Sequence, residues 1–196
     1  RIGNFKYYFN EYCAMEQDLD NILGRQSSYQ ITVNRVKCQV MVYAKSETGK
    51  FDIPVKTFTC SVGKAGTPTH AGQYATLKKS NPVELMGPSY GKYGTQINIY
   101  GDWFHSVACS NEDPTFALSA GNFNMLGQPA SHGCVRLCVR DAKWIYDNCG
   151  LYTTVLISDK EATPFDRPAT IKIPSGQNWD PTDEVALKIL AGKNNN

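Results

Sequence analysis

Residues 131–138 read SHGCVRLC and bring one histidine and two cysteines close together in the chain. Such a stretch fits three chemistries: a metal clip, a disulfide anchor, or a nucleophile on a tight turn. His132, Cys134 and Cys138 are ligand types that zinc accepts, but structural zinc sites usually complete their tetrahedron with a second ligand pair. The chain has three histidines in all and no Cys-x-x-Cys pair. The sequence therefore predicts no structural metal.

Cys134 has the neighbours that a nucleophilic thiol needs. A thiol attacks as the thiolate, so it requires a base or a positive local field. Gly133 lets backbone amides approach a substrate carbonyl oxygen, and Ser131 or His132 can orient the group. His105, in DWFHSV at the end of a predicted strand, is the candidate base. A satisfied core histidine is the alternative for His105, and the downstream Ser-His-Gly-Cys favours catalysis.

The other cysteines leave several pairings open. Seven is an odd number, so an exported form of the chain would keep at least one free thiol. A disulfide between Cys134 and Cys138 would be regulatory, although packing or pairing elsewhere is the commoner fate of such a neighbour. No pattern fixes the disulfides among the six remaining cysteines, which are Cys13, Cys38, Cys60, Cys109, Cys138 and Cys149.

One pair of cysteines can be placed by register. Residues 29–44 and 51–63 alternate between apolar and polar types and flank the turn KSETGK, so they predict a β-hairpin. A turn at Thr48 and Gly49 would set Cys38 opposite Cys60 on the apolar face. Directly opposed pairs often strain disulfide geometry, which favours two core thiols over a cross-strand disulfide.

Composition predicts one compact globular domain. The 196 residues are 41% hydrophobic and 19% charged, with a net charge of only +2 and scattered basic residues. These values argue against disorder and against nucleic-acid binding. No apolar run is long enough for a membrane span. The chain opens without a visible signal peptide, and a leader removed upstream would leave the same sequence, so the compartment stays open.

The pattern of elements predicts a mostly β fold with a few short helices. Residues 1–28 carry aromatic residues at helical spacing, which predicts an N-terminal helical extension or the end of an upstream region. Residues 29–160 hold the strands and a short helix at 141–150, and they form the predicted catalytic domain. Residues 161–196 form a polar, proline-rich tail.

Four segments in order resemble the L,D-transpeptidase catalytic domain family. They are VGKAGTPTHAGQY, FHSV, SHGCVRL, and DAKWIYDN followed by TTVLI. The resemblance covers about residues 29–158. The resemblance implies a β-sandwich-like fold. The 25 residues between His105 and Ser131 are more than the family usually has, which predicts an inserted loop near the site mouth. We expect residues 110–126 of that loop to act as a lid that excludes water. His70 occupies a variable position of the family pattern. We expect a loop residue there, with contact to the substrate as the less favoured alternative.

The resemblance also implies roles for the motif residues. Cys134 would be the nucleophile and His105 its general base, with the backbone carbonyl of Ser106 holding the imidazole in position. The amides of Gly133 and Cys134 would form much of the oxyanion hole. Arg136 would fix the site or bind a substrate carboxylate, for which its rigid fork is suited. The remaining assignments are His132, which would support the turn or polarise the site, and Ser131, which would bind substrate.

By the same resemblance, the reaction would be acyl transfer between peptidoglycan tetrapeptide stems, forming 3→3 cross-links and releasing D-Ala. No metal or organic cofactor would be needed, and carbapenems would acylate the thiol. The substrate implies a bacterial protein whose domain lies outside the cytoplasmic membrane, in the cell wall or anchored to the membrane.

Three alternatives accompany this expectation. The same fold could act as a hydrolase, either an L,D-carboxypeptidase or a peptidoglycan amidase, or as a wall-binding module without catalysis. A papain-type protease fits poorly, because that family wants its cysteine before its histidine, and here His105 precedes Cys134.

Overall fold

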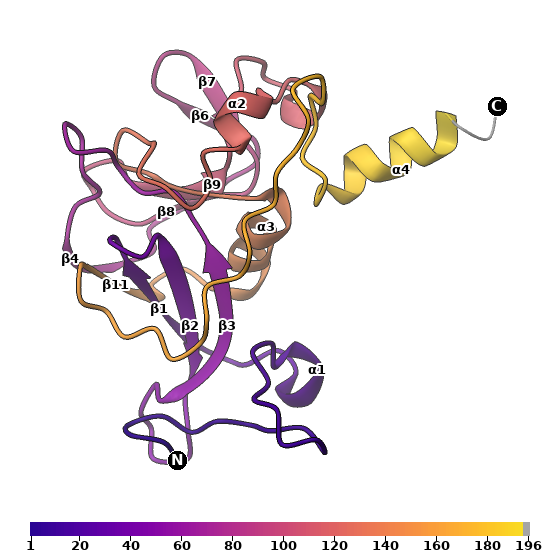
Figure 1. The fold of residues 1–196 in the computed structure, drawn as a ribbon. Helices are drawn as coiled ribbons and strands as arrows, with labels where there is room; N and C mark the ends of the chain where they lie inside the picture. Colours follow the sequence, from indigo (N-terminus) through magenta and orange to yellow (C-terminus); the bar gives the residue numbers. More distant parts are fainter. Residues whose placement is uncertain (194–196) are drawn as a thin grey trace.

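The computed structural model of the chain describes residues 1–193 and is built on two sheets packed face to face (Figure 1). In the first sheet the strand order is β3-β2-β1-β11-β4. Its hairpin strands are antiparallel, while β11 runs parallel to β1 and antiparallel to β4. The strands of this sheet are β1 (Tyr29–Asn34), β2 (Gln39–Ala44), β3 (Ile53–Thr59), β4 (Gly72–Ala75) and β11 (Thr154–Ser158).

The second sheet has the order β10-β9-β8-β5. Its β9 and β10 are parallel, and the other two pairs are antiparallel. A separate two-stranded hairpin, β6 and β7, precedes β8 along the chain. The bounds are β5 (Lys79–Ser80), β6 (Val83–Leu85), β7 (Ser89–Gly91), β8 (Gly94–Gln96), β9 (Trp103–Ser106) and β10 (Val135–Leu137).

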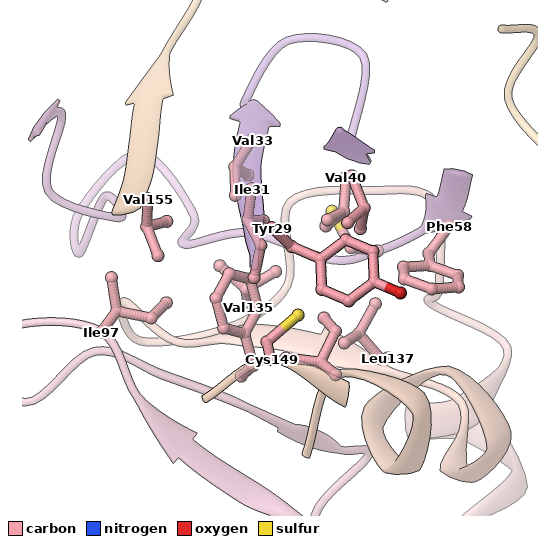
Figure 2. Packing of buried hydrophobic residues seen from close by; sticks show 14 of the residues in the cluster. Tyr29, Ile31, Val33, Val40, Phe58, Ile97, Val135, Leu137, Cys149 and Val155 are labelled. Carbon is pink, nitrogen blue, oxygen red and sulfur yellow. The ribbon is translucent and has the colours of Figure 1, made fainter. Parts of the chain in front are cut away.

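The main core lies between the two sheets and helix α3 (Val139–Asn148) (Figure 2). Ile31 and Val33 point into it from β1, Val135 and Leu137 from β10, and Cys149 from the end of α3. Burial of this apolar surface is the main force that holds the sheets together. The predicted mostly β, sandwich-like fold with few short helices is confirmed.

The hairpin register agrees with the prediction. Val40 of β2 pairs with Phe58 of β3, and the Cys60 amide donates a hydrogen bond of 2.9 Å to the Cys38 carbonyl. Both thiols are free and fully buried, as are the side chains around them. Burial raises the pKa of both. They therefore pack as core thiols.

The predicted N-terminal helix is wrong over most of its length, because only α1 (Asp20–Leu23) is helical. The segment before it runs irregularly along the outer face of the first sheet. There Phe5 stacks on Tyr43 with ring centroids 5.6 Å apart, and the Leu19 amide bonds to the Val55 carbonyl at 3.0 Å. Some of the aromatic residues are spaced as in a helix, but Phe5 gains burial against the sheet instead, while Phe9 and Tyr12 stay exposed.

The C-terminal residues also cover the first sheet before they reach the second. The Phe165 carbonyl accepts from Gln39 Nε2 at 3.0 Å, and the Pro168 carbonyl accepts from Thr59 Oγ1 at 2.6 Å. Because segments from both ends of the chain lie on this face, every residue of β2 is buried. The chain then ends in α4 (Glu184–Lys193), which projects from the body in Figure 1. Residues 194–196 of the predicted tail lie outside the described residues.

The segment between β9 and β10 builds a small core of its own. It contains a 3-10 turn, η1 (Pro114–Phe116), and helix α2 (Ala120–Phe123). Phe123 and Leu126 pack there against Cys138 and Ile173. No residue of 110–126 lines the cavity at Cys134, so the predicted lid is not supported: its apolar side chains are used against the C-terminal segment. Within residues 1–193, no helix is long and apolar enough to cross a membrane.

Candidate active site

Parallel strands β9 and β10 bring the predicted nucleophile and base to one place. Arg136 of β10 pairs with His105 of β9, and Cys134 is the last residue before β10. All three line a cavity of about 310 Å³ at this end of the second sheet. Glu84 of β6 and His70 of the loop before β4 border the same cavity. Residues from four segments of the chain therefore converge on Cys134.

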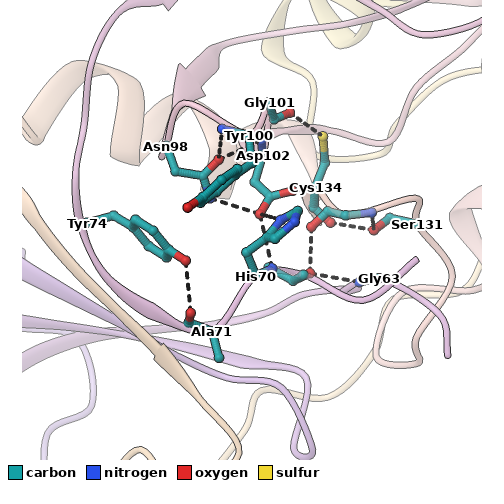
Figure 3. A network of polar contacts seen from close by, with 12 residues as sticks. Gly63, His70, Ala71, Tyr74, Asn98, Tyr100, Gly101, Asp102, Ser131 and Cys134 are labelled. Carbon is teal, nitrogen blue, oxygen red and sulfur yellow. Dashed lines mark hydrogen bonds and ion pairs between the residues drawn. The ribbon is translucent and has the colours of Figure 1, made fainter. Parts of the chain in front are cut away.

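The turn that carries Cys134 is held by hydroxyl groups. Ser131 Oγ donates to the Cys134 carbonyl at 2.5 Å and accepts from the Gly133 amide at 3.1 Å. From the glycine-rich loop, Thr69 Oγ1 donates to the Gly133 carbonyl at 2.5 Å and accepts from the Gly63 amide at 2.8 Å (Figure 3). The GKAGTPT stretch thus acts on the site by clamping the turn.

These contacts bear on two predicted roles. The Ser131 hydroxyl is engaged inside the turn and the residue is fully buried, so its hydroxyl acts on the turn instead of on a substrate. The Gly133 amide is bonded to Ser131 and would have to be released to bind an oxyanion. His132 is exposed at the cavity rim.

Gly133 is a position where a side chain cannot be accommodated. Its φ is +130°, and a Cβ there would lie 2.6 Å from Asp102 Oδ1. We expect Gly133→Ala to cost about 1–3 kcal/mol of unfolding free energy and to slow acylation of Cys134, because the turn must shift away from Asp102. Urea unfolding and quenched intact-mass spectrometry measure the two effects. Gly176→Ala is the control, since a Cβ at Gly176 meets nothing within 4 Å; equal behaviour of the two variants would contradict the prediction.

His105 has the tautomer that a base for the thiol requires. Its Nδ1 lies 2.5 Å from the Ser106 carbonyl, and because a carbonyl only accepts, Nδ1 carries the proton. Nε2 then has a free lone pair. The imidazole is buried, and burial is the largest cause that lowers its pKa from 6.5 to about 4. The Ser106 carbonyl raises that pKa and the Arg136 charge lowers it further.

The lowered pKa of His105 makes the free energy of unfolding depend on pH. The unfolded chain binds the His105 proton at about pH 6.5, and the folded chain only near pH 4, so acid between these values favours unfolding by up to about 3 kcal/mol. We expect the free energy of unfolding to fall between pH 7 and pH 4, and to fall less for His105→Asn, whose amide can still bond to Ser106. Urea titrations at the two pH values measure this. Equal falls in both proteins would contradict it.

Cys134 is also neutral at rest. Its Sγ lies 3.7 Å from the Gly101 carbonyl, and burial raises its pKa to about 11; the Trp103 amide lowers it, the Asp102 charge raises it and the Arg136 charge lowers it. A raised thiol pKa and a lowered imidazole pKa both disfavour a resting thiolate–imidazolium pair. The thiol proton must therefore leave as the sulfur attacks.

Arg136 lines the cavity with a positive charge that has no carboxylate partner within residues 1–193. Its Nη1 donates to the Ala130 carbonyl at 3.2 Å, and its buried Nε has no hydrogen-bond partner among the described residues. Burial lowers its pKa, which reflects the cost of holding this cation away from water. An anionic substrate group would relieve that cost, so the arrangement suits carboxylate binding.

Two residues of the cavity were not predicted from the sequence. Asp102 is buried beside the Gly133 turn and accepts from Asn98 Nδ2 at 2.9 Å. His70, for which the sequence favoured a loop residue over one that touches substrate, lines the cavity and contacts Asp102. The one available signal was the position of Asp102 in GDWFHS, three residues before His105.

Comparison with known proteins agrees with this geometry. The sequence profile of the L,D-transpeptidase catalytic domain, YkuD, matches residues 28–157. The chain belongs to this family. It is 44% identical over 68 residues to YciB of Bacillus subtilis (strain 168), whose name marks it as a candidate L,D-transpeptidase; the match covers 34% of each chain.

Solved structures give the same fold. A fused Zn-dependent amidase/peptidase/peptidoglycan-binding domain-containing protein from Clostridium acetobutylicum ATCC 824 is 27% identical with a TM-score of 0.50, over 67% of this chain and 52% of that one. LdtMt1 of Mycobacterium tuberculosis, solved with imipenem, is 17% identical with a TM-score of 0.53, over 67% and 59%. This L,D-transpeptidase-family chain thus spans about a third of YciB and just over half of these structures.

Proposed function

We propose that the chain is a peptidoglycan L,D-transpeptidase that forms 3→3 cross-links through an acyl-enzyme on Cys134. The observation that carries the proposal is the cavity in which Cys134, His105 and Arg136 meet at the paired ends of β9 and β10. Family membership supports an enzyme of this kind.

In the first half-reaction Cys134 Sγ attacks the carbonyl carbon at the L-centre of the third stem residue, a diamino acid. A C–S bond forms as Nε2 of His105 takes the thiol proton. The C–N bond to the terminal D-Ala then breaks, and the imidazolium gives that proton to the leaving amine. The products are a thioester and free D-Ala.

In the second half-reaction the side-chain amine of another stem attacks the thioester carbonyl. A C–N bond forms and the C–S bond breaks. The amine loses one N–H proton in this step and the sulfur gains one, which restores the Cys134 thiol. Arg136 suits a carboxylate of the bound stems, since its guanidinium faces the cavity and forms no ion pair within residues 1–193. Neither step requires a metal or an organic cofactor.

Two further proposals follow from this chemistry. Peptidoglycan stems lie outside the cytoplasmic membrane, so the domain would work in the cell wall or anchored to the membrane from outside. A β-lactam carbonyl would meet the same thiol, and LdtMt1, which has this fold, was solved with imipenem. We therefore expect carbapenems to acylate Cys134.

The test is incubation with a disaccharide-tetrapeptide, followed by intact-mass analysis of the protein and identification of the released products. A thioester adduct, D-Ala and a cross-linked dimer are expected. A shortened stem without a dimer would replace the transferase with an L,D-carboxypeptidase. No adduct in the presence of a reductant, with peptidoglycan binding intact, would replace it with a wall-binding module.

A further inference from the structure

Besides the buried His105 and the exposed His132, a third imidazole lines the cavity, and a carboxylate holds it in place. His70 Nδ1 lies 2.8 Å from Asp102 Oδ2, and the His70 amide donates to the same oxygen at 3.1 Å. The ring stacks on Tyr100, with centroids 4.7 Å apart and planes at 22°. These contacts, drawn in Figure 3, fix the ring in one orientation.

Asp102 is placed to hold a charge on this ring. Its side chain is 4% exposed, whereas that of His70 is 48% exposed. Asn98 Nδ2 donates to Oδ2, and Asn98 Oδ1 accepts from the Asp102 amide at 3.1 Å. A carboxylate held by such bonds sets the tautomer of a histidine and stabilises the imidazolium that forms.

With Nδ1 on Asp102, the Nε2 atom of His70 is the free end of the ring. Within residues 1–193 it has no hydrogen-bond partner, and the residue lines the same cavity as Cys134. Asp102 also contacts the Cys134 turn, where its Oδ1 lies against Gly133. A lone pair on a half-exposed ring beside the nucleophile can accept a proton from a group that enters from solvent.

We propose that His70, positioned by Asp102, is the general base for the acceptor amine in the second half-reaction. This inference rests on the proposed transpeptidase function. As the amine nitrogen forms its bond to the thioester carbon, one N–H proton passes to Nε2 of His70. The electron pair of the breaking C–S bond stays on sulfur. The imidazolium of His70 releases its proton to solvent and the sulfur takes one from solvent, so that both groups return to their resting states.

The two half-reactions suit different bases, because one nucleophile is a buried thiol and the other is an amine that enters from solvent. His105 is 1% exposed and holds its imidazole in the interior, where it serves a thiol that is also largely buried. An acceptor stem arrives as an ammonium ion. It must lose one proton before its nitrogen can attack, and a second as the amide bond forms. His70 lies at the solvent side of the cavity, with Asp102 to offset the positive charge that it gains. Each half-reaction thus has a base suited to its own nucleophile.

The test separates the two half-reactions in single-turnover experiments. The protein is first mixed with the tetrapeptide donor, and thioester formation is followed by quenched intact mass. A tripeptide acceptor with a free side-chain amine is then added, and thioester loss and cross-linked product are followed. For His70→Gln we expect acylation within about threefold of the natural chain, and aminolysis slower by about 100-fold, so that the thioester accumulates.

Three controls distinguish proton transfer by His70 from a structural role of this residue. Tyr74→Phe removes a hydrogen bond to the Ala71 carbonyl in the same loop without touching an imidazole, and should leave both rates unchanged. Hydroxylamine is largely neutral at neutral pH, so it should shrink the defect of His70→Gln. Imidazole in solution should partly restore aminolysis by His70→Ala, but not by Asp102→Asn, where the ring is still present and only its positioning is lost.

Two outcomes would overturn the role of His70 as general base while leaving the proposed function intact. Equal slowing of acylation and aminolysis in His70→Gln would make His70 a structural residue of the turn. Unchanged aminolysis would remove it from the reaction. The absence of any thioester on the unsubstituted protein would overturn the proposed function itself, and this inference with it.

Discussion

Replacing Cys134 with serine is expected to lower transpeptidation by at least about 10⁴-fold and to abolish the covalent adduct. A serine hydroxyl is far less acidic than a thiol, and His105 is a weak base, because burial lowers its pKa to about 4. The pair is matched to a sulfur nucleophile, whose proton is lost more easily. Product formation from disaccharide-tetrapeptides and intact mass after carbapenem treatment measure the two losses.

The matched control for this variant is Cys13→Ser. Cys13 is an exposed free thiol far along the chain from the site motif, so its loss should change neither turnover nor the adduct. An adduct that persists in Cys134→Ser but disappears in Cys13→Ser would contradict the assignment. Cys138→Ser is a less suitable control, since Cys138 is buried in the core of the inserted segment.

Opposite charges flank Cys134. The Arg136 guanidinium lowers the pKa of the thiol and the Asp102 carboxylate raises it, while burial dominates both. A guanidinium can bind a stem carboxylate, and a carboxylate can hold an imidazolium, so each charge also has a partner in the proposed reaction. The same two groups therefore tune the nucleophile and organise the groups around it.

Local sequence patterns predicted the hairpin and the motif residues, because these depend on residues that lie close together in the chain. Alternation in residues 29–63 gave the hairpin and its register, because side chains on a strand point to alternate faces. The Ser-His-Gly-Cys motif pointed to Cys134, and FHSV to His105. Their meeting depends on the parallel pairing of β9 with β10, which two short segments cannot indicate by themselves. The family resemblance supplied their roles but not this pairing.

The predictions that were wrong or incomplete share one physical cause, which is contact between segments distant in sequence. Phe5 and Met15 near the N-terminus fit a helical spacing, yet they pack on Met41 and Tyr43 of β2. The segment between β9 and β10 was expected to act as a lid, yet its apolar side chains pack on Ile173. His70 and Asp102 are 32 residues apart, and no spacing rule links a loop residue to the residue before a strand.

A buried ion pair ties the C-terminal segment to Lys92, which lies in the short link between β7 and β8. Lys92 Nζ lies 2.5 Å from Asp183 Oδ2 and 2.9 Å from Thr115 Oγ1, and both charged side chains are less than a tenth exposed. The backbone of Lys92 also contacts Ser106, whose carbonyl orients His105: the Lys92 amide donates to Ser106 Oγ at 2.8 Å. The tail is therefore connected to the base through two residues.

Asp183→Asn is expected to lower the free energy of unfolding by about 3–5 kcal/mol. Asparagine keeps the shape of the side chain and its cap on Val185, whose amide bonds to Asp183 Oδ1 at 3.0 Å, but it leaves the Lys92 ammonium buried without a counter-charge. Urea unfolding at neutral pH measures the loss. Turnover should fall as well, since Lys92 shifts relative to Ser106.

The matched control is the exposed pair of Lys143 and Asp147, which lie one helical turn apart in α3. Asp147→Asn there should cost less than about 0.5 kcal/mol, because water already solvates both charges. The double variant Lys92→Met/Asp183→Leu should recover most of the stability, since replacing both charges leaves neither one buried alone. A loss in Asp183→Asn no larger than that in Asp147→Asn would show that the tail is held by its apolar and backbone contacts, and that Lys92 finds other partners when its carboxylate is removed.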